Sequence, residues 1–252
     1  MHKIVLITGA TAGFGKAIAE KFASQHWNCI ITGRRSEKLH VFADVLREKY
    51  STRILSLVFD IRNKEEVAQN LEHLPEEWRE IDVLVNNAGL ALGRETIENG
   101  NTDDWDTMID TNVKGLLYVT KSIAPYMIAK KRGHIINMGS IAGKEVYEKG
   151  NVYCATKFAV DALSHSMRVD LLQHKIKVTS INPGAAETEF SLVRYKGNKE
   201  LADLAYQGYT PLHAEDIADI TWYVANLPEH VCINDLSVTC TSQADTKYMI
   251  KE

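Results

Sequence analysis

The chain has 252 residues, of which 45% are hydrophobic and 25% are charged, so it is long enough for one large α/β domain. A formal net charge of -4 gives no basic surface for nucleic acid or an anionic membrane, and no apolar run approaches the length of a membrane span. The four cysteines and nine histidines show no metal-ligand spacing. We therefore expect reduced thiols, a cytoplasmic location, no metal, and partners that are small molecules rather than nucleic acid or membrane.

Short β-branched and apolar runs alternate along the chain with helical patterns. The predicted strands are 3–8, 28–33, 53–59, 82–87, 133–139, 177–182 and 236–240. The predicted helices between them include 15–26 and 105–131, the second with a kink or break near Pro125. This alternation predicts an α/β, Rossmann-like doubly wound fold with a mostly seven-stranded parallel sheet and helices on both faces. No linker or repeat interrupts it, so residues 1–252 should form one domain that binds ligands at the carboxyl ends of its strands.

A glycine-rich segment, TGATAGFG, follows the first predicted strand and opens a helix. Gly9 permits a tight turn, Gly13 lets the backbone approach a pyrophosphate, and Gly15 permits close packing of the helix. The helix N-terminus adds free N–H groups and the positive end of a dipole. A plain strand-to-helix turn could use the same glycines. Their position after the first strand favours a dinucleotide.

The second predicted strand ends in Gly33, Arg34 and Arg35. An enzyme specific for NAD(H) usually places a carboxylate here to hold the ribose 2′-hydroxyl. This chain has two guanidiniums instead, which suit a bidentate contact with a 2′-phosphate. A solvated basic turn is the alternative reading. Together with the glycine segment, the pair favours NADP(H) over NAD(H).

A tyrosine and a lysine lie one helical turn apart in the predicted helix that begins at Asn151. Tyr153 and Lys157 project from the same face. A free phenol, with a pKa of about 10, is a poor base at neutral pH, and a nearby ammonium should lower that pKa. Ser140 ends the fifth strand and Asn112 lies inside the long helical pattern. The alternatives are a phenol lying over a snorkelling lysine and a satisfied core amide.

The motifs taken together resemble the short-chain dehydrogenase/reductase family over essentially the whole chain. They are the glycine segment, NNAG at 86–89, Asn112, Ser140, the Tyr153–Lys157 pair and PG at 183–184. Within that family the chain is more similar to the NADP-dependent 3-hydroxy acid (serine or allo-threonine) dehydrogenases, through TGRR, NNAGLALG, GNVYCATKFAV and ETEFSLVRYKG. That group usually has Leu-Val where this chain has Ala185 and Ala186. We expect a roomier pocket wall there, with cofactor binding retained.

The resemblance implies a role for each motif residue. Tyr153 would be the acid/base, Lys157 would hold the nicotinamide ribose, and Ser140 would orient the substrate oxygen. Asn112 would anchor a water that leads protons from Lys157 to solvent, and Thr188 would help to hold the carboxamide and phosphates. The implied cofactor-binding residues are Gly9, Thr11, Ala12, Gly13, Phe14, Gly15, Arg34, Arg35, Asp60, Ile61, Asn87, Ala88, Gly89, Tyr153, Lys157, Pro183, Gly184, Ala186 and Thr188.

A carboxylate substrate needs a cation in the pocket. Arg194, in a segment of about 186–212 that should cover the substrate, is the preferred partner; Lys144 and Lys196 are rivals, and Arg194 could instead be solvated. The expected reaction is hydride transfer between NADP(H) and the C3 hydroxyl or carbonyl of a small 3-hydroxy acid such as serine, allo-threonine or 3-hydroxypropionate. The alternatives are a reductase of a neutral ketone, aldehyde or 3-oxoacyl thioester, and a non-catalytic NADP sensor. The family resemblance and the apolar stripes of the helices after Asp106 and Tyr153 predict a homotetramer.

Overall fold

The computed structural model of the chain describes residues 3–252; Met1 and His2, which the predicted domain included, lie outside the described residues. One parallel sheet has the strand order β3-β2-β1-β4-β5-β6-β7. Its strands are β1 (Ile4–Ile7), β2 (Asn28–Gly33), β3 (Ile54–Val58), β4 (Ile81–Asn86), β5 (Gly133–Met138), β6 (Ile176–Pro183) and β7 (Asp235–Val238). Each predicted strand is present within two residues at either end. The predicted doubly wound fold is confirmed.

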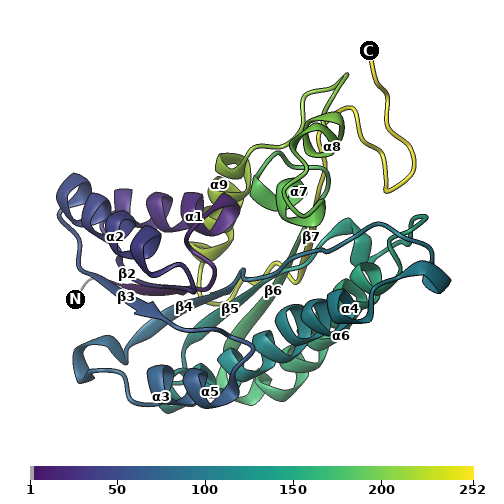
Figure 1. Cartoon of the computed structure of the whole chain (residues 1–252). Helices are drawn as coiled ribbons and strands as arrows, with labels where there is room; N and C mark the ends of the chain where they lie inside the picture. The colour runs from purple at the N-terminus through teal and green to yellow at the C-terminus, as the bar shows by residue number, and fades with distance from the viewer. Residues whose placement is uncertain (1–2) are drawn as a thin grey trace.

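Helices cover both faces of this sheet (Figure 1). One face carries α1 (Gly13–Ser24), α2 (Ser36–Tyr50) and α9 (Ala214–Ala225), and the other carries α3 (Lys64–Leu71), α4 (Thr102–Ile109), α5 (Leu116–Ala129) and α6 (Asn151–Asp170). Within β1, Val5 and Ile7 join the core on the α1 side, whereas Ile4 and Leu6 join the core on the α5 side. Because both faces are covered, these strands are continuous apolar runs rather than alternating ones.

The long helical pattern predicted for 105–131 is divided, but not at its proline. The chain runs from α4 through a π-helical stretch, Asp110–Gly115, into α5. Helix α5 continues through Pro125 to Ala129, so of the predicted kink or break there, the break is wrong. The irregular turn instead holds Asn112, and single π turns often occur at functional sites.

The strand order reverses between β1 and β4, where an open α/β sheet forms its ligand crevice. Two short helices, α7 (Glu189–Arg194) and α8 (Lys199–Leu204), follow β6 and supply part of the cover over that end of the sheet. Within residues 3–252, no helix is both long enough and apolar enough to cross a membrane.

Candidate active site

A cavity of about 690 Å³ opens at the carboxyl ends of the strands. Every predicted cofactor residue lines it except Gly15, and so do Ser140 and Arg194. Asn112 is not part of the lining. The structure therefore brings the glycine segment, the β2 arginines, the Tyr153–Lys157 pair and the PG turn to one space.

The glycine segment forms a cradle without side chains at the positions nearest the cavity. Gly9 and Gly13 have φ angles of +69° and +49°, in the left-handed region that favours glycine. Asn87 Nδ2 donates to the Thr8 carbonyl at 2.8 Å and so ties this loop to the end of β4. A Cβ on Gly15 would overlap Asn87 and the Gly9 carbonyl, so Gly15 serves close packing rather than the cavity wall. The cradle fits a dinucleotide.

Two arginines at the end of β2 mark the nucleotide end of the cavity. Arg34 is about half exposed, and its Nη1 lies 3.4 Å from Asp60 Oδ2. Arg35 donates to Thr11 Oγ1 and forms an ion pair with Glu189, whose carboxylate lies 2.8 Å from Nη1. Glu189 belongs to α7, so the segment after β6 contacts the arginine pair directly. The sequence analysis did not single out Glu189.

Lys157 is buried on α6 and hydrogen-bonds to a backbone carbonyl. Its Nζ donates to the Met138 carbonyl at 2.8 Å, and burial lowers the pKa of its ammonium to about 8. No carboxylate lies within ion-pair distance of Lys157 among residues 3–252. A Cβ on Gly89 would lie 3.2 Å from Asn112 Oδ1 and 3.7 Å from Lys157 Nζ, so the missing side chain keeps the space beside both groups open.

Tyr153 is buried one turn before Lys157. Burial raises the pKa of the Tyr153 phenol well above its usual value, while a hydrogen bond with Ser140 and the charge of Arg194 act to lower it. The Lys157 Nζ lies 5.9 Å from the Tyr153 ring centroid. The pKa of the phenol is therefore raised by burial in this structure rather than lowered as predicted, and the charge of Arg194 acts against that rise.

Asn112 makes three hydrogen bonds to neighbouring protein groups. Its Oδ1 accepts from Leu90 N at 2.8 Å, and its Nδ2 donates to the Leu90 carbonyl and to Thr156 Oγ1. Thr156 lies on α6 between Tyr153 and Lys157. Asn112 thus fixes the loop after β4 to the helix that carries the pair.

Arg194 lies at the substrate end of the cavity, over the Tyr153 ring. Its Cζ is 5.7 Å from that ring's centroid, its Nη1 donates to Tyr147 Oη at 2.8 Å, and its Nε donates to the Gly93 carbonyl at 3.3 Å. Phe190 also packs on Tyr153, with ring centroids 5.6 Å apart. Arg94 lies over the Tyr147 ring at 5.9 Å. Sequence reasoning missed Tyr147, Phe190 and Arg94, because no motif marks them.

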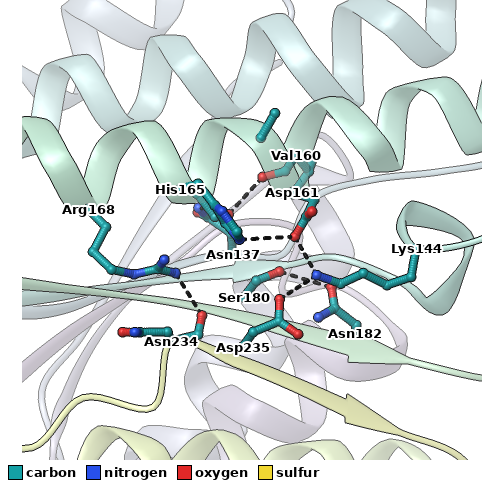
Figure 2. Close-up of polar contacts among 12 residues, drawn as sticks. Asn137, Lys144, Val160, Asp161, His165, Arg168, Ser180, Asn182, Asn234 and Asp235 are labelled. Atoms are coloured by element: carbon teal, nitrogen blue, oxygen red, sulfur yellow. Dashed lines mark hydrogen bonds and ion pairs between the residues drawn. The ribbon is translucent and has the colours of Figure 1, made fainter.

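The rival cations are already paired with carboxylates. Lys144 Nζ lies 2.6 Å from both Asp161 and Asp235 (Figure 2), and Lys196 Nζ lies 2.8 Å from Asp104. In the described part of the chain, no carboxylate lies within 4 Å of the Arg194 guanidinium. Of the three candidates, Arg194 alone both lines the cavity and keeps its charge free for a ligand.

A glycine cradle at the β1–β4 reversal and a buried Tyr-x-x-x-Lys pair define a dinucleotide-dependent oxidoreductase fold. Residues 3–198 match the family model of the short chain dehydrogenases, and the chain belongs to that family. The prediction of the family is confirmed.

Individual relatives agree closely over the whole chain. It is 48% identical over 242 residues to the NADP-dependent 3-hydroxy acid dehydrogenase YdfG of Salmonella typhi, covering 96% of each chain. It is 43% identical over 251 residues to sulfoacetaldehyde reductase 2 of Chromohalobacter salexigens, covering 99% of each. A solved structure described as the closed form of serine dehydrogenase complexed with NADP⁺ is 44% identical, with a TM-score of 0.92 over 99% of each chain.

Proposed function

We propose that this protein transfers a hydride between NADP(H) and the C3 hydroxyl or carbonyl of a small 3-hydroxy acid, of the serine, allo-threonine or 3-hydroxypropionate class. The observation that carries the substrate class is the Arg194 guanidinium, which lies over Tyr153 and has no carboxylate partner among residues 3–252. The relatives' names support the proposal, since hydroxy acids and sulfoacetaldehyde share an anionic group close to the reacting carbon.

The proposed roles at the nucleotide end follow from position. The glycine cradle would hold the pyrophosphate, and Arg34 and Arg35 would hold the 2′-phosphate. Asp60 and Ile61 would border the adenine, and Lys157 and Thr188 would hold the nicotinamide end. When bound, the nicotinamide supplies or accepts the hydride.

Tyr153 and Ser140 handle the substrate oxygen in this proposal. Because burial raises its pKa, the phenol stays protonated at neutral pH and is ready to give a proton to the carbonyl oxygen during reduction. In the oxidative direction the phenol must first lose that proton, which Ser140 and Arg194 favour. The hydrogen bond that Ser140 donates to the Pro183 carbonyl is long, at 3.4 Å, so its hydroxyl can turn to the substrate.

Arg194 binds the carboxylate in this proposal and places the C3 oxygen at Tyr153. Tyr147 accepts a hydrogen bond from the same guanidinium and thereby restricts where it points. Asn112 contributes by fixing the loop after β4, and its proposed water would lie on the open side of Gly89.

The test is a substrate panel assayed with NADP(H) and NAD(H). It holds 3-hydroxy acids, hydroxy amino acids, sulfoacetaldehyde, neutral ketones and aldehydes, and a 3-oxoacyl thioester. We expect small anionic substrates and NADP(H) to give the highest kcat/KM. Equal or better turnover of neutral carbonyls would support the reductase alternative. Tight NADP(H) binding with no turnover of any compound would support the sensor alternative.

The assembly, location and domain organisation belong to the same proposal. We infer a homotetramer in the cytoplasm, one domain over residues 1–252, and a substrate cover at about 186–212. Apolar side chains remain exposed on the α4–α6 side, namely Ile109, Leu117, Phe158 and Val169. A second copy of the chain could bury them. Sedimentation of a stable monomer at micromolar concentration would contradict the tetramer.

A further inference from the structure

A short turn follows the catalytic serine and lies directly on the helix of the Tyr153–Lys157 pair. Ser140 Oγ accepts from Ala142 N at 3.1 Å, at the start of the 3-10 helix η4 (Ile141–Gly143). A Cβ on Gly143 would lie 2.6 Å from the Lys157 carbonyl. The position of Ser140 relative to Tyr153 therefore depends on how this turn is held against α6.

Lys144, the residue after η4, reaches two other elements with one ammonium. Its Nζ lies 2.6 Å from Asp161 Oδ1 on α6 and 2.6 Å from Asp235 Oδ2 at the start of β7 (Figure 2). Asp161 is one helical turn beyond Lys157 on α6. A single side chain thus joins the turn after Ser140, the helix of Tyr153 and Lys157, and the last strand of the sheet.

The surrounding charges give this contact more weight than an ordinary surface ion pair. The three side chains are 29%, 22% and 32% exposed, so water screens them only in part. A carboxylate oxygen of Asp161, an imidazole nitrogen of His165 and a carboxylate oxygen of Asp235 lie within 4.8 Å of one another. Without the ammonium, two carboxylates would face each other across this gap and repel. Partial burial acts to lower the pKa of Lys144, but the hydrogen bonds of the two carboxylates raise it overall, so the ammonium is retained.

We propose that Lys144 is a positioning residue for Ser140: its ion pairs with Asp161 and Asp235 hold the η4 turn on α6 so that the serine hydroxyl stays beside the Tyr153 phenol. Lys144 does not line the cavity. This proposal rests on the proposed function, because the position of Ser140 is measured through its effect on turnover.

The test compares Lys144→Met in the wild-type chain and in a Ser140→Ala chain. A displaced catalytic group lowers turnover by about tenfold to a hundredfold, so Lys144→Met should lower kcat by that factor and leave the KM for NADP(H) unchanged. In the Ser140→Ala chain the same substitution should cause little further loss, because the group that Lys144 positions is gone. Equal losses in both chains, or a wild-type kcat, would overturn the proposal.

Two variants separate positioning from general stability. Lys144→Arg keeps the charge and should restore most of kcat. Lys130→Met is a matched control, because Lys130 also pairs with two carboxylates, Asp82 and Glu80, at the opposite end of the strands. It should lower the melting temperature without changing kcat. If Lys144→Met does not fold, Asp235→Asn removes one of the two pairs and should show the same dependence on Ser140.

Hydrogen exchange gives a readout that needs no substrate. The amides of Ala142 and Gly143 should exchange faster in Lys144→Met than in the wild type or in Lys130→Met. Unchanged exchange of these amides would count against the positioning role of Lys144 even if turnover fell. The two proposals can fail separately. If the wild type turns over no substrate with NADP(H), but the Ala142 and Gly143 amides exchange faster in Lys144→Met, the proposed function is refuted and the positioning role of Lys144 is supported.

Discussion

The two ends of the cavity are built differently. At the nucleotide end, the cradle residues are neighbours in sequence, from Thr8 to Gly15, with Arg34 and Arg35 at the end of the next strand. At the substrate end, Arg194 contacts Tyr147 and Tyr153, and the three residues come from three separate segments of the chain. The first end can be recognised in a stretch of sequence, whereas the second exists only when the chain is folded.

The cations at the two ends also differ in their partners. Arg35 forms an ion pair with Glu189 and donates a hydrogen bond to Thr11. The Arg35 and Glu189 side chains are nearly half exposed, so their ion pair is weak. Arg194 is partly buried, and among residues 3–252 no carboxylate neutralises it. A partly desolvated cation without a counterion is costly, and an anionic ligand would offset that cost.

The largest expected effect is at Tyr153, which lies at the substrate end beside Arg194. Tyr153→Phe removes the transferable proton and should lower kcat by about 10²- to 10⁴-fold, because general acid–base catalysis contributes that much. Fluorescence titration should show unchanged NADP(H) affinity. A near-normal rate would exclude Tyr153 as the acid/base and revive the sensor alternative.

The nucleotide end can be broken by neutralising both arginines. Charge-assisted hydrogen bonds contribute about 1.5–3 kcal/mol each, so Arg34→Gln with Arg35→Gln should weaken NADP(H) binding by about a hundredfold or more. NAD(H) binding should change little, as isothermal titration can measure. Arg53→Gln, an exposed arginine paired with Glu77, is the control. A wild type that uses NAD(H) as efficiently as NADP(H) would contradict the assignment.

The substrate end can be broken at Arg194. Arg194→Met should raise the KM for serine or 3-hydroxypropionate by about ten- to a hundredfold, since one charge-assisted contact is lost. Binding of NADP(H) and any reduction of neutral ketones should persist. Lys196→Met is the matched control, because Lys196 lies two residues away and is already paired with Asp104. Unchanged kinetics with carboxylates would show that Arg194 does not bind the substrate.

The smallest expected effect is on stability, at Lys157. Burial lowers the pKa of Lys157 from 10.5 to about 8, so the unfolded chain binds the extra proton between those pH values. The free energy of unfolding of the wild type should therefore rise as the pH increases from about 8 to about 10.5, and the penalty is fully present below pH 8.

Lys157→Met should abolish that rise and stabilise the protein at pH 7 by roughly 1–3 kcal/mol, while removing turnover. Denaturant unfolding at pH 7 and pH 10 measures both effects. A Met variant that is less stable than the wild type at pH 7 would show that the Lys157 contact with Met138 outweighs the cost of burial.

How far the sequence reached differs from residue to residue. The roles of Gly9 and Gly13 could be predicted from the sequence, because a positive φ and a close backbone approach leave few other residues possible. The break considered at Pro125 is absent, since α5 continues to Ala129, although a proline within a helical pattern usually kinks or ends the helix. The pKa of Tyr153 could not be predicted from its spacing to Lys157, because burial and the charge of Arg194 act on the phenol and neither is visible in sequence.

By itself the sequence determined the strand–helix alternation, the glycine cradle, the arginine pair and the Tyr153–Lys157 spacing, because each depends on residues close together along the chain. Only the tertiary structure decided which of Arg194, Lys144 and Lys196 lacks a carboxylate partner among the described residues. Lys144 forms ion pairs with Asp161 and Asp235, and Lys196 forms one with Asp104, and each partner is distant in sequence. Charge pairing falls off with distance in space rather than along the chain, and folding sets that distance.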